Sequence, residues 1–229
     1  ASKKISERSA RTTGSAGTRD VEKGTEETKV SLLRTNDIRE MSVPIHLRNT
    51  PQEHGRAEII DHAFLISYLA KWYKPNLYVE YGVRGADCIY QVLPYCKKVW
   101  GVDIAPSYYR HPDFEFFQMS TREFKDILET RKPVIDMAFI DACHKSEVVL
   151  QDFDDLFPYV IEDGLIFLHD TYPMSREYTS PDYCNDCWRV PNALKNKYQG
   201  RIEILTLPVQ PGLTMVKKLR QTPLEWMTE

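Results

Sequence analysis

Apolar and polar positions change their period near residue 75. Between residues 58 and 73, apolar side chains recur at helical spacing along one face, and Pro75 with Asn76 ends the pattern. The run Leu-Tyr-Val-Glu-Tyr at 77–81 is instead short and apolar, as is typical of a strand buried on both sides. We therefore predict a helix that ends at residue 73 and a strand immediately after it.

The same change of period repeats to the end of the chain. This alternation predicts a parallel sheet with helices on both faces. The two terminal strands are joined only by Pro-Val-Gln-Pro-Gly, too short for a crossover helix, so they must form an antiparallel hairpin. The expected fold class is α/β, a doubly wound, mostly parallel seven-stranded sheet with a C-terminal antiparallel hairpin. Beyond 77–81, strands are predicted at 99–103, 114–118, 134–141, 164–170, 202–207 and 213–218, and helices at 84–95, 121–131, 146–160 and 188–199.

Three segments stand outside this alternation. Residues 1–40 are polar and carry few large apolar side chains, a composition that predicts a flexible arm. We therefore place the folded domain at 41–229 and expect a loop at 41–56. The segment 172–187, called the lid segment below, has the polar composition of a mobile loop. The acceptor of any reaction would be selected by 41–56 and by the lid segment.

Charge and composition exclude several classes of protein. The chain has 229 residues and a formal net charge of −3, which does not favour nucleic acid as a partner. No apolar stretch is long enough to span a membrane, and the polar N-terminal region lacks the core of a signal peptide. We expect a cytoplasmic protein that has no nucleic-acid or membrane partner and can form a homo-oligomer.

The five cysteines do not form a recognisable framework. Their number is odd and their spacing irregular, which is unlike a secreted disulfide scaffold. Cys184 and Cys187 form a single C-x-x-C, but no second pair at suitable spacing completes a four-ligand zinc site. We expect Cys184 and Cys187 to be free thiols of unknown role.

In a doubly wound sheet ligands bind beyond the carboxyl ends of the strands. The first predicted strand ends in Glu80, followed by Gly82 and Gly85. A dinucleotide fingerprint would have glycine in place of Glu80, with Gly82 and Gly85 as its second and third glycines. A carboxylate is unfavourable beside a pyrophosphate and favourable beside an ammonium group. The segment therefore favours a nucleoside that carries an amine over a nicotinamide dinucleotide.

The next two strand ends extend this nucleoside site. Asp103 ends the second strand, where an acid typically accepts hydrogen bonds from ribose hydroxyls. An ordinary acid that caps the next turn is the alternative for Asp103. Met119 and Ser120 follow the third strand and could flank an adenine ring, although Thr121 beside them also suits a helix N-cap.

Asp141 ends the fourth strand and Asp170 the fifth. Adjacent parallel strands lie about 5 Å apart, so these two carboxylates can meet, and they repel unless a cation lies between them. A hard divalent cation such as Mg²⁺ is the natural candidate, and it would ease deprotonation of a substrate hydroxyl. His144 could then accept the proton. The alternatives are a locally bonded histidine at 144 and a core histidine bonded to backbone at 169.

Four stretches now resemble a known family: 79–88, 99–103, 139–147 and 164–172. They are similar, in order and spacing, to the motifs of class I S-adenosylmethionine (SAM)-dependent methyltransferases, which have a Rossmann-like fold. The closest resemblance is to small O-methyltransferases that include the macrocin and mycinamicin sugar methyltransferases.

The resemblance implies a role for each of these residues. Glu80, Gly82 and Gly85 would hold the methionine part of SAM, Asp103 the ribose, and Met119 or Ser120 the adenine, with Asp141 beside the cofactor. Asp141, Asp170 and His169 would hold the metal, and Asp141 and His144 would be catalytic. One departure is that the sugar methyltransferases carry a carboxylate where this chain has His169.

These observations predict a SAM-dependent O-methyltransferase that acts on a hydroxyl of a small molecule, a sugar or glycosylated metabolite, assisted by a divalent cation. Two alternatives stay open, an NAD-dependent oxidoreductase and a non-catalytic SAM-binding protein. Binding of SAM, its product S-adenosylhomocysteine (SAH) and NAD would separate the first from the prediction. Turnover would separate the second.

Overall fold

The computed structural model describes residues 61–209 and 211–221 of the chain. The predicted arm at 1–40, the loop at 41–56 and the start of the first predicted helix lie outside these residues. All of the strand ends singled out in the sequence lie within them.

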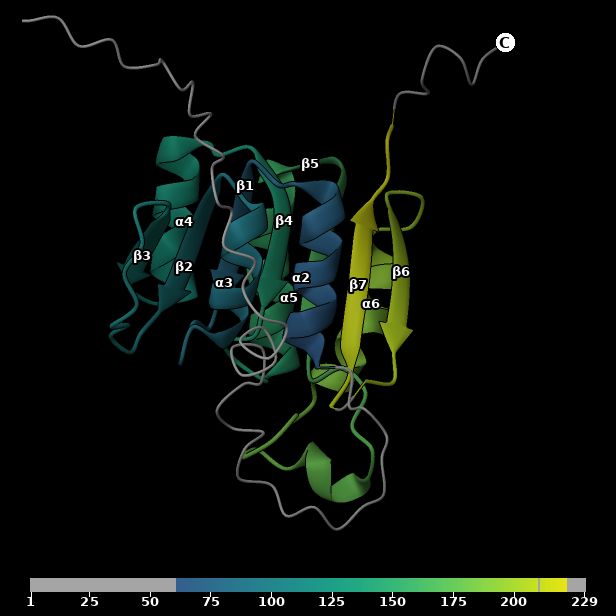
Figure 1. Ribbon diagram of the computed structural model, residues 1–229. Coiled ribbons are helices and arrows are strands. Elements are labelled where there is room, and N and C mark those ends of the chain that lie inside the picture. The colour runs from purple at the N-terminus through teal and green to yellow at the C-terminus, as the bar shows by residue number, and fades with distance from the viewer. Residues whose placement is uncertain (1–60, 210, 222–229) are drawn as a thin grey trace, which may run out of the picture. The chain divides into compact units, whose positions relative to one another are not determined.

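A seven-stranded sheet organises the described residues, in the order β3-β2-β1-β4-β5-β7-β6 (Figure 1). The first five strands pair in parallel, and β7 runs antiparallel to both of its neighbours. The predicted fold class, including the terminal hairpin, is confirmed. The strands are β1 (Leu77–Tyr81), β2 (Lys98–Asp103), β3 (Phe114–Gln118), β4 (Ile135–Ile140), β5 (Val160–His169), β6 (Ile202–Leu207) and β7 (Leu213–Lys218).

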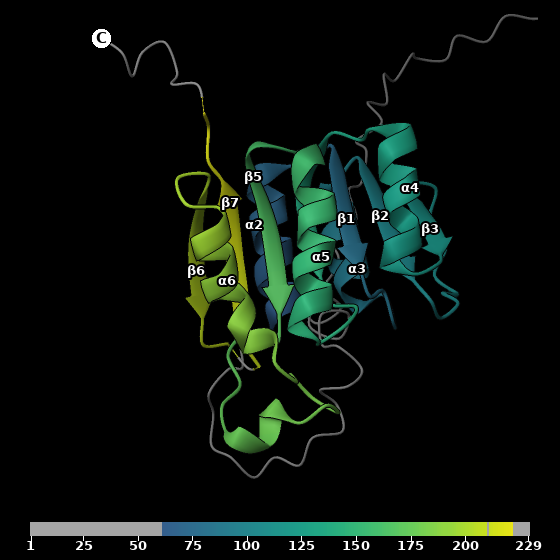
Figure 2. The ribbon, with the colours of Figure 1, turned by 180° about the vertical axis from the view of Figure 1, so that it is seen from behind.

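Helices cover both faces of the sheet, and each face has its own apolar core. α2 (His62–Tyr73) and α3 (Asp87–Val92) lie on one face (Figure 1). The opposite face carries α4 (Thr121–Arg131), α5 (Ser146–Leu156) and α6 (Val190–Lys197), as Figure 2 shows. Ile66 and Ile89 belong to the first core, and Phe124, Phe153 and Leu194 to the second. Burial of these side chains holds the helices against the sheet.

Three predicted helices, those at 84–95, 146–160 and 188–199, are shorter in the structure, and for the first two the backbone explains why. Arg84 and Ala86 have positive φ values of 43° and 64°, which no α-helix accommodates, so α3 begins only at Asp87. α5 ends at Leu156 and passes through a 3-10 turn that contains Pro158. β5 then begins at Val160, four residues earlier than the pattern indicated.

The carboxyl ends of the parallel strands meet at one edge of the sheet. In both ribbon views the lid segment lies beyond this edge (Figures 1 and 2). No helix within residues 61–221 combines the length and hydrophobicity that crossing a bilayer requires.

Candidate active site

A cavity of about 850 Å³ opens at the carboxyl ends of the strands. Its walls come from the segments that follow β1 to β5 and from the lid segment, as expected for a doubly wound sheet. Eight of the predicted site residues line the cavity, namely Gly82, Asp103, Met119, Ser120, Asp141, His144, His169 and Asp170, whereas Glu80 and Gly85 do not.

Asp103 is held rigidly at one end of this cavity. Its Oδ2 accepts the backbone N–H of Arg84 at 2.8 Å, and its Oδ1 accepts that of Ala105 at 2.8 Å. Each carboxylate oxygen can accept a further hydrogen bond. Asp103 is thus fixed in orientation and can still accept hydrogen bonds from the two hydroxyls of a ribose. It caps the turn that follows β2, and this leaves it free to act as a ribose ligand as well.

Gly82 lets β1 pass close to the end of β4. Its φ of 88° is a conformation that side chains rarely adopt, and a Cβ here would collide with the carbonyl oxygen of Asp141. The glycine therefore keeps the backbone that carries Asp141 in place. Gly85 has no such constraint, because a Cβ there would make only an ordinary contact of 3.4 Å with Asp87.

Glu80 lies behind the cavity wall. Its carboxyl is buried and accepts a hydrogen bond of 2.7 Å from the hydroxyl of Tyr78. Burial raises the pKa of Glu80 to about 8, although the bonds to Tyr78 and Cys88 act in the opposite direction. Contact between Glu80 and the amine of SAM stays a prediction.

The N-cap of α4 is Ser120 and not Thr121. Its hydroxyl accepts the N–H of Glu123, while the Glu123 carboxylate accepts the backbone N–H of Ser120 at 2.9 Å, which completes a capping box. The Ser120 hydroxyl is therefore engaged within the helix. Met119 remains the better candidate for flanking an adenine ring.

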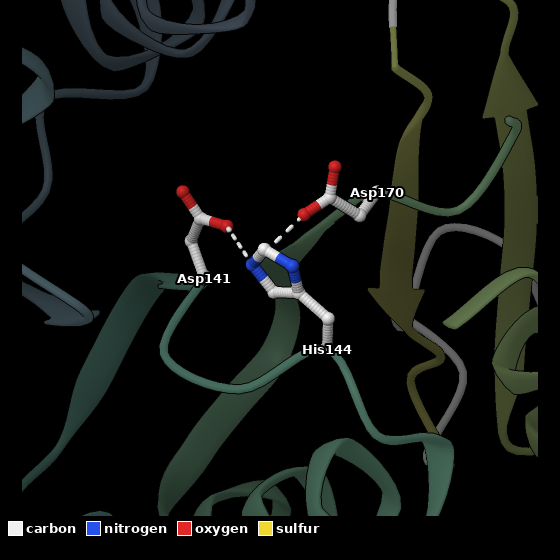
Figure 3. A group of neighbouring side chains, drawn as sticks. All are labelled: Asp141, His144 and Asp170. Atoms are coloured by element: carbon white, nitrogen blue, oxygen red, sulfur yellow. Dashed lines mark ion pairs between the residues drawn. The ribbon is translucent and has the colours of Figure 1, made fainter. Parts of the chain in front are cut away.

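Two aspartates and two histidines form a compact group at the ends of β4 and β5, called the His–Asp cluster below. Asp141, His144 and Asp170 each offer a ligand atom within 4.8 Å of the others (Figure 3). His144 Nε2 lies 3.0 Å from Asp170 Oδ2 and 3.8 Å from Asp141 Oδ1. The predicted meeting of Asp141 and Asp170 is confirmed.

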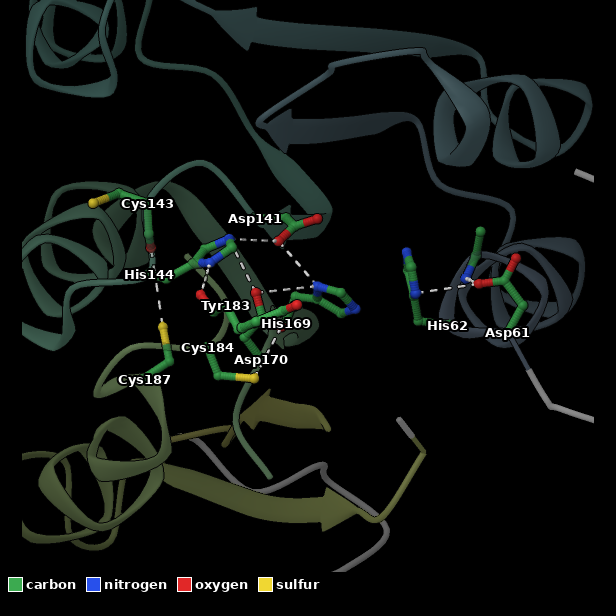
Figure 4. A network of polar contacts seen from close by, with 11 residues as sticks. Asp61, His62, Asp141, Cys143, His144, His169, Asp170, Tyr183, Cys184 and Cys187 are labelled. Atoms are coloured by element: carbon green, nitrogen blue, oxygen red, sulfur yellow. Dashed lines mark hydrogen bonds and ion pairs between the residues drawn. The ribbon is translucent and has the colours of Figure 1, made fainter. Parts of the chain in front are cut away.

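The fourth member, His169, faces the same two oxygens from the other side. Its Nδ1 lies 3.0 Å from Asp141 Oδ1 and 3.6 Å from Asp170 Oδ2 (Figure 4). The alternative of a core histidine bonded to backbone is therefore not observed. The ring of His62, from α2, packs against His169 with a centroid distance of 4.2 Å. Nε2 of His169 is buried and has no hydrogen-bond partner among the described residues.

The cluster balances negative and positive charge. The hydrogen bond to Asp170 raises the pKa of His144 to about 9. Burial alone would lower the pKa of His169, but Asp141 and Asp170 outweigh it and raise that pKa to about 10. Burial likewise opposes ionisation of Asp170, yet both histidines hold its pKa well below the usual range. Two carboxylates this close thus need a cation, and here protonated imidazoles supply the charge.

The lid segment closes the cavity over the cluster. The backbone carbonyl of Tyr183 contacts His144 Nδ1, and Cys184 Sγ lies 3.4 Å from Asp170 Oδ1. Ser146 does not cap α5 as its sequence position suggests, since Lys145 is the N-cap. The backbone N–H and hydroxyl of Ser146 instead both donate to Asp186 of the lid segment at 2.7 Å.

Some cavity residues carried no sequence signal. Tyr178 and Tyr183 pair with a ring-centroid distance of 5.3 Å and both line the cavity, together with Asp182. His62 reaches the cluster from a helix about 100 residues before it. These positions depend on long-range folding. The length and polarity of the lid segment could have pointed to Tyr178, Asp182 and Tyr183, but nothing in the sequence pointed to His62. None of the five cysteines forms a disulfide.

Comparison with known proteins agrees with this geometry. Residues 90–171 match the family described as "Methyltransferase domain". The chain has a methyltransferase fold. The resemblance to methyltransferases found in the sequence is thereby confirmed over these residues. The sequence has no match among curated proteins.

Solved structures share this methyltransferase fold at low sequence identity. A Staphylococcus aureus protein provisionally named a caffeoyl-CoA O-methyltransferase is 17% identical, with a TM-score of 0.57, over 80% of this chain and 91% of its own. MycE, from the mycinamycin biosynthetic pathway, in complex with Mg, SAH and mycinamycin VI, is 18% identical, with a TM-score of 0.54, over 71% of this chain. The match covers only 51% of MycE. TomG from Streptomyces achromogenes, in complex with SAM, is 12% identical, with a TM-score of 0.54, over 69% of this chain and 79% of its own.

Proposed function

We propose that this protein is a SAM-dependent O-methyltransferase whose acceptor is a hydroxyl of a small molecule, of the sugar or glycosylated-metabolite class. The observation that carries the proposal is the His–Asp cluster, which lies in the same cavity as the fixed carboxylate of Asp103. A nucleoside site and a proton-accepting group thus face one space, as a transfer between two bound molecules requires. The MycE complex, which holds SAH and mycinamycin VI, supports this acceptor class.

The nucleoside end would bind SAM through several contacts. Asp103 would accept hydrogen bonds from the ribose hydroxyls, and Met119 would pack against the adenine. Bound SAM supplies a methyl group already activated for displacement. The protein then has to place an acceptor oxygen in line with that methyl group and exclude water.

His144 would take the proton of the acceptor hydroxyl. Its Nδ1 is held by the Tyr183 carbonyl, which leaves Nε2 as the atom that faces the cavity. In this structure the protonated Nε2 pairs with Asp170, so the imidazole must first lose that proton and exchange Asp170 for the acceptor hydroxyl before it can act as a base. Asp141 and Asp170 would keep the imidazolium in place after transfer.

The residues also fit a divalent cation. Asp141 and Asp170 each offer a ligand atom within 4.8 Å of the other, and His169 Nδ1 lies 3.0 Å from Asp141 Oδ1 and 3.6 Å from Asp170 Oδ2. These three residues would hold the ion, which would lower the pKa of a bound hydroxyl. The Mg in the MycE complexes supports this part of the proposal. The predicted location in the cytoplasm, the absence of a nucleic-acid partner and a homo-oligomeric state remain predictions.

The test is methyl transfer from labelled SAM across a panel of sugars, glycosides and phenols, with amines and thiols in the same panel. We expect transfer to at least one hydroxyl acceptor. His144→Ala should lower the rate by about 100-fold or more, the scale of general-base catalysis, while SAH binding is kept. The matched control is His111→Ala, at an exposed histidine before β3, which should leave the rate unchanged. Full activity in His144→Ala would remove the base assignment, and transfer only to nitrogen or sulfur acceptors would contradict O-methylation.

A further inference from the structure

The two carboxylate oxygens of the His–Asp cluster have histidine nitrogens on both sides. His144 Nε2 lies 3.8 Å from Asp141 Oδ1 and 3.0 Å from Asp170 Oδ2. His169 Nδ1 lies 3.0 Å and 3.6 Å from the same two oxygens. Two ligand atoms about 2.1 Å from one ion lie roughly 3.0 Å apart at a right angle and roughly 3.4 Å apart at the tetrahedral angle. An ion that binds both carboxylates and displaces the proton of His169 Nδ1 therefore has that nitrogen close to ligand spacing.

The nitrogen of His169 is the more firmly placed of the two. Its side chain is only 12% exposed, packs against His62 and meets Phe139 edge-on at a centroid distance of 5.9 Å. The residue ends β5, where its backbone pairs with Leu213 of β7. Since no described residue bonds Nε2, the ring orientation is set by this packing and by the contacts of Nδ1. His144, by contrast, depends on the lid segment and is 35% exposed.

This donor set suits some divalent cations better than others. Mg²⁺ prefers an all-oxygen shell, whereas imidazole nitrogen favours Zn²⁺, Ni²⁺, Co²⁺ and Fe²⁺. For mixed nitrogen and oxygen sites, affinity rises along the first transition series. The Mg²⁺ predicted from the sequence therefore fits the two carboxylates but not the nitrogen of His169.

We propose that the His–Asp cluster is a mixed nitrogen and oxygen site that binds a first-row transition metal in preference to Mg²⁺. His169 Nδ1 is the ligand that makes the site prefer the transition metal. The proposal rests on the proposed function only in taking the cluster as its cation site. It deepens that function by naming the class of ion.

The test uses metal binding to the full chain without SAM or acceptor, so that its outcome is independent of methyl transfer. Co²⁺ is the probe, because its visible absorption reports its ligands, and Mg²⁺ and Zn²⁺ are the competitors. We expect one Co²⁺ per chain, displaced by equimolar Zn²⁺ and retained in about tenfold excess Mg²⁺. His169→Asp replaces the nitrogen ligand by oxygen. It should lower the affinity for Co²⁺ and raise the affinity for Mg²⁺, each by about tenfold or more, because even changes outside the ligand shell have effects of this size.

Two further variants locate the effect. His111→Asp makes the same substitution at an exposed histidine outside the cavity and should leave the preference unchanged. His144→Asn should also keep the preference for Co²⁺. SAH binding by each variant shows that it is folded, and it reports the proposed function separately. The proposal is overturned if Mg²⁺ binds as tightly as Co²⁺, if no metal binds, or if His144→Asn and not His169→Asp reverses the preference.

Discussion

At the scale of single residues, the position of Glu80 sets a pH dependence for cofactor binding. Its carboxyl has a pKa of about 8, because burial opposes its charge, so it is mostly protonated at pH 7. An ammonium group brought close to it would favour the charged form. Binding of SAM or SAH should therefore release a proton from Glu80.

We predict that SAH affinity rises with pH between about 6 and 8. Below the pKa of Glu80 in the free protein, each unit by which the pH falls lowers the affinity for SAH by up to about tenfold, because Glu80 must lose its proton before it can pair with the amine. Calorimetric titration of SAH across this range measures the slope. Glu80→Gln should bind more weakly at pH 8 and show no such slope. A slope that persists in Glu80→Gln would assign the proton to another group.

The sequence predicts which residues meet in the site where strand pairing alone decides their positions. Asp141 and Asp170 could be placed together because parallel pairing puts the ends of β4 and β5 side by side. The same reasoning could not show that Glu80 lies behind the cavity wall, since the strand pattern does not say which neighbours bury a side chain. It also could not find His62, whose contact with His169 depends on how α2 packs on the sheet.

At the scale of elements, α5 carries a buried charge that costs stability. Asp152 is 3% exposed, and its Oδ2 has no hydrogen-bond partner among the described residues. Burial raises the pKa of Asp152 from 3.8 to about 6, although a hydrogen bond from Thr121 of α4 acts against this. The folded state thus prefers the neutral carboxyl. Its ionisation destabilises the fold little below pH 4, increasingly between pH 4 and 6, and fully above pH 6.

We predict that Asp152→Asn raises the free energy of unfolding at pH 7.5 by about 1 to 3 kcal/mol, because the amide has the shape of the acid without its charge. At pH 4.5 the gain should nearly vanish. Urea unfolding at the two pH values measures both. The control Glu147→Gln, at an exposed position in the first turn of the same helix, should instead lose up to about 1 kcal/mol at pH 7.5. An equal gain at both pH values would show that the charge of Asp152 is not the cause.

The elements themselves were predicted well in their centres and poorly at their ends. Hydrophobic periodicity located every strand, but the ends of α3 and α5 depend on positive φ values and a proline turn that break the helical backbone. The sequence also left the cap of α4 open, with Thr121 named as a residue that suits it. Ser120 and Thr121 are both good caps, and only the capping box with Glu123 decides between them.

At the scale of the whole molecule, strand order concentrates the chemistry at one edge of the sheet. The order reverses between β1 and β4, so the segments after β1 and β2 lie beside those after β4 and β5. The nucleoside end and the His–Asp cluster therefore share one cavity. The sequence predicted this arrangement from the alternation of strands and helices. The placement of the lid segment over the cluster depends on contacts across about 40 residues, such as Ser146 with Asp186, which no local pattern encodes.

A cavity that is a SAM site binds SAH and not a nicotinamide dinucleotide, and calorimetric titration of the protein with SAH and with NAD decides between the two. We predict that SAH binds at one site per chain and that NAD does not bind. Asp103→Ala should lower the affinity for SAH by about tenfold or more through loss of the ribose contacts. Asp113→Ala, at an exposed carboxylate that pairs with Lys98, is the control and should bind SAH as the natural chain does. Binding of NAD without binding of SAH would mean that the cavity is a dinucleotide site and would favour the oxidoreductase.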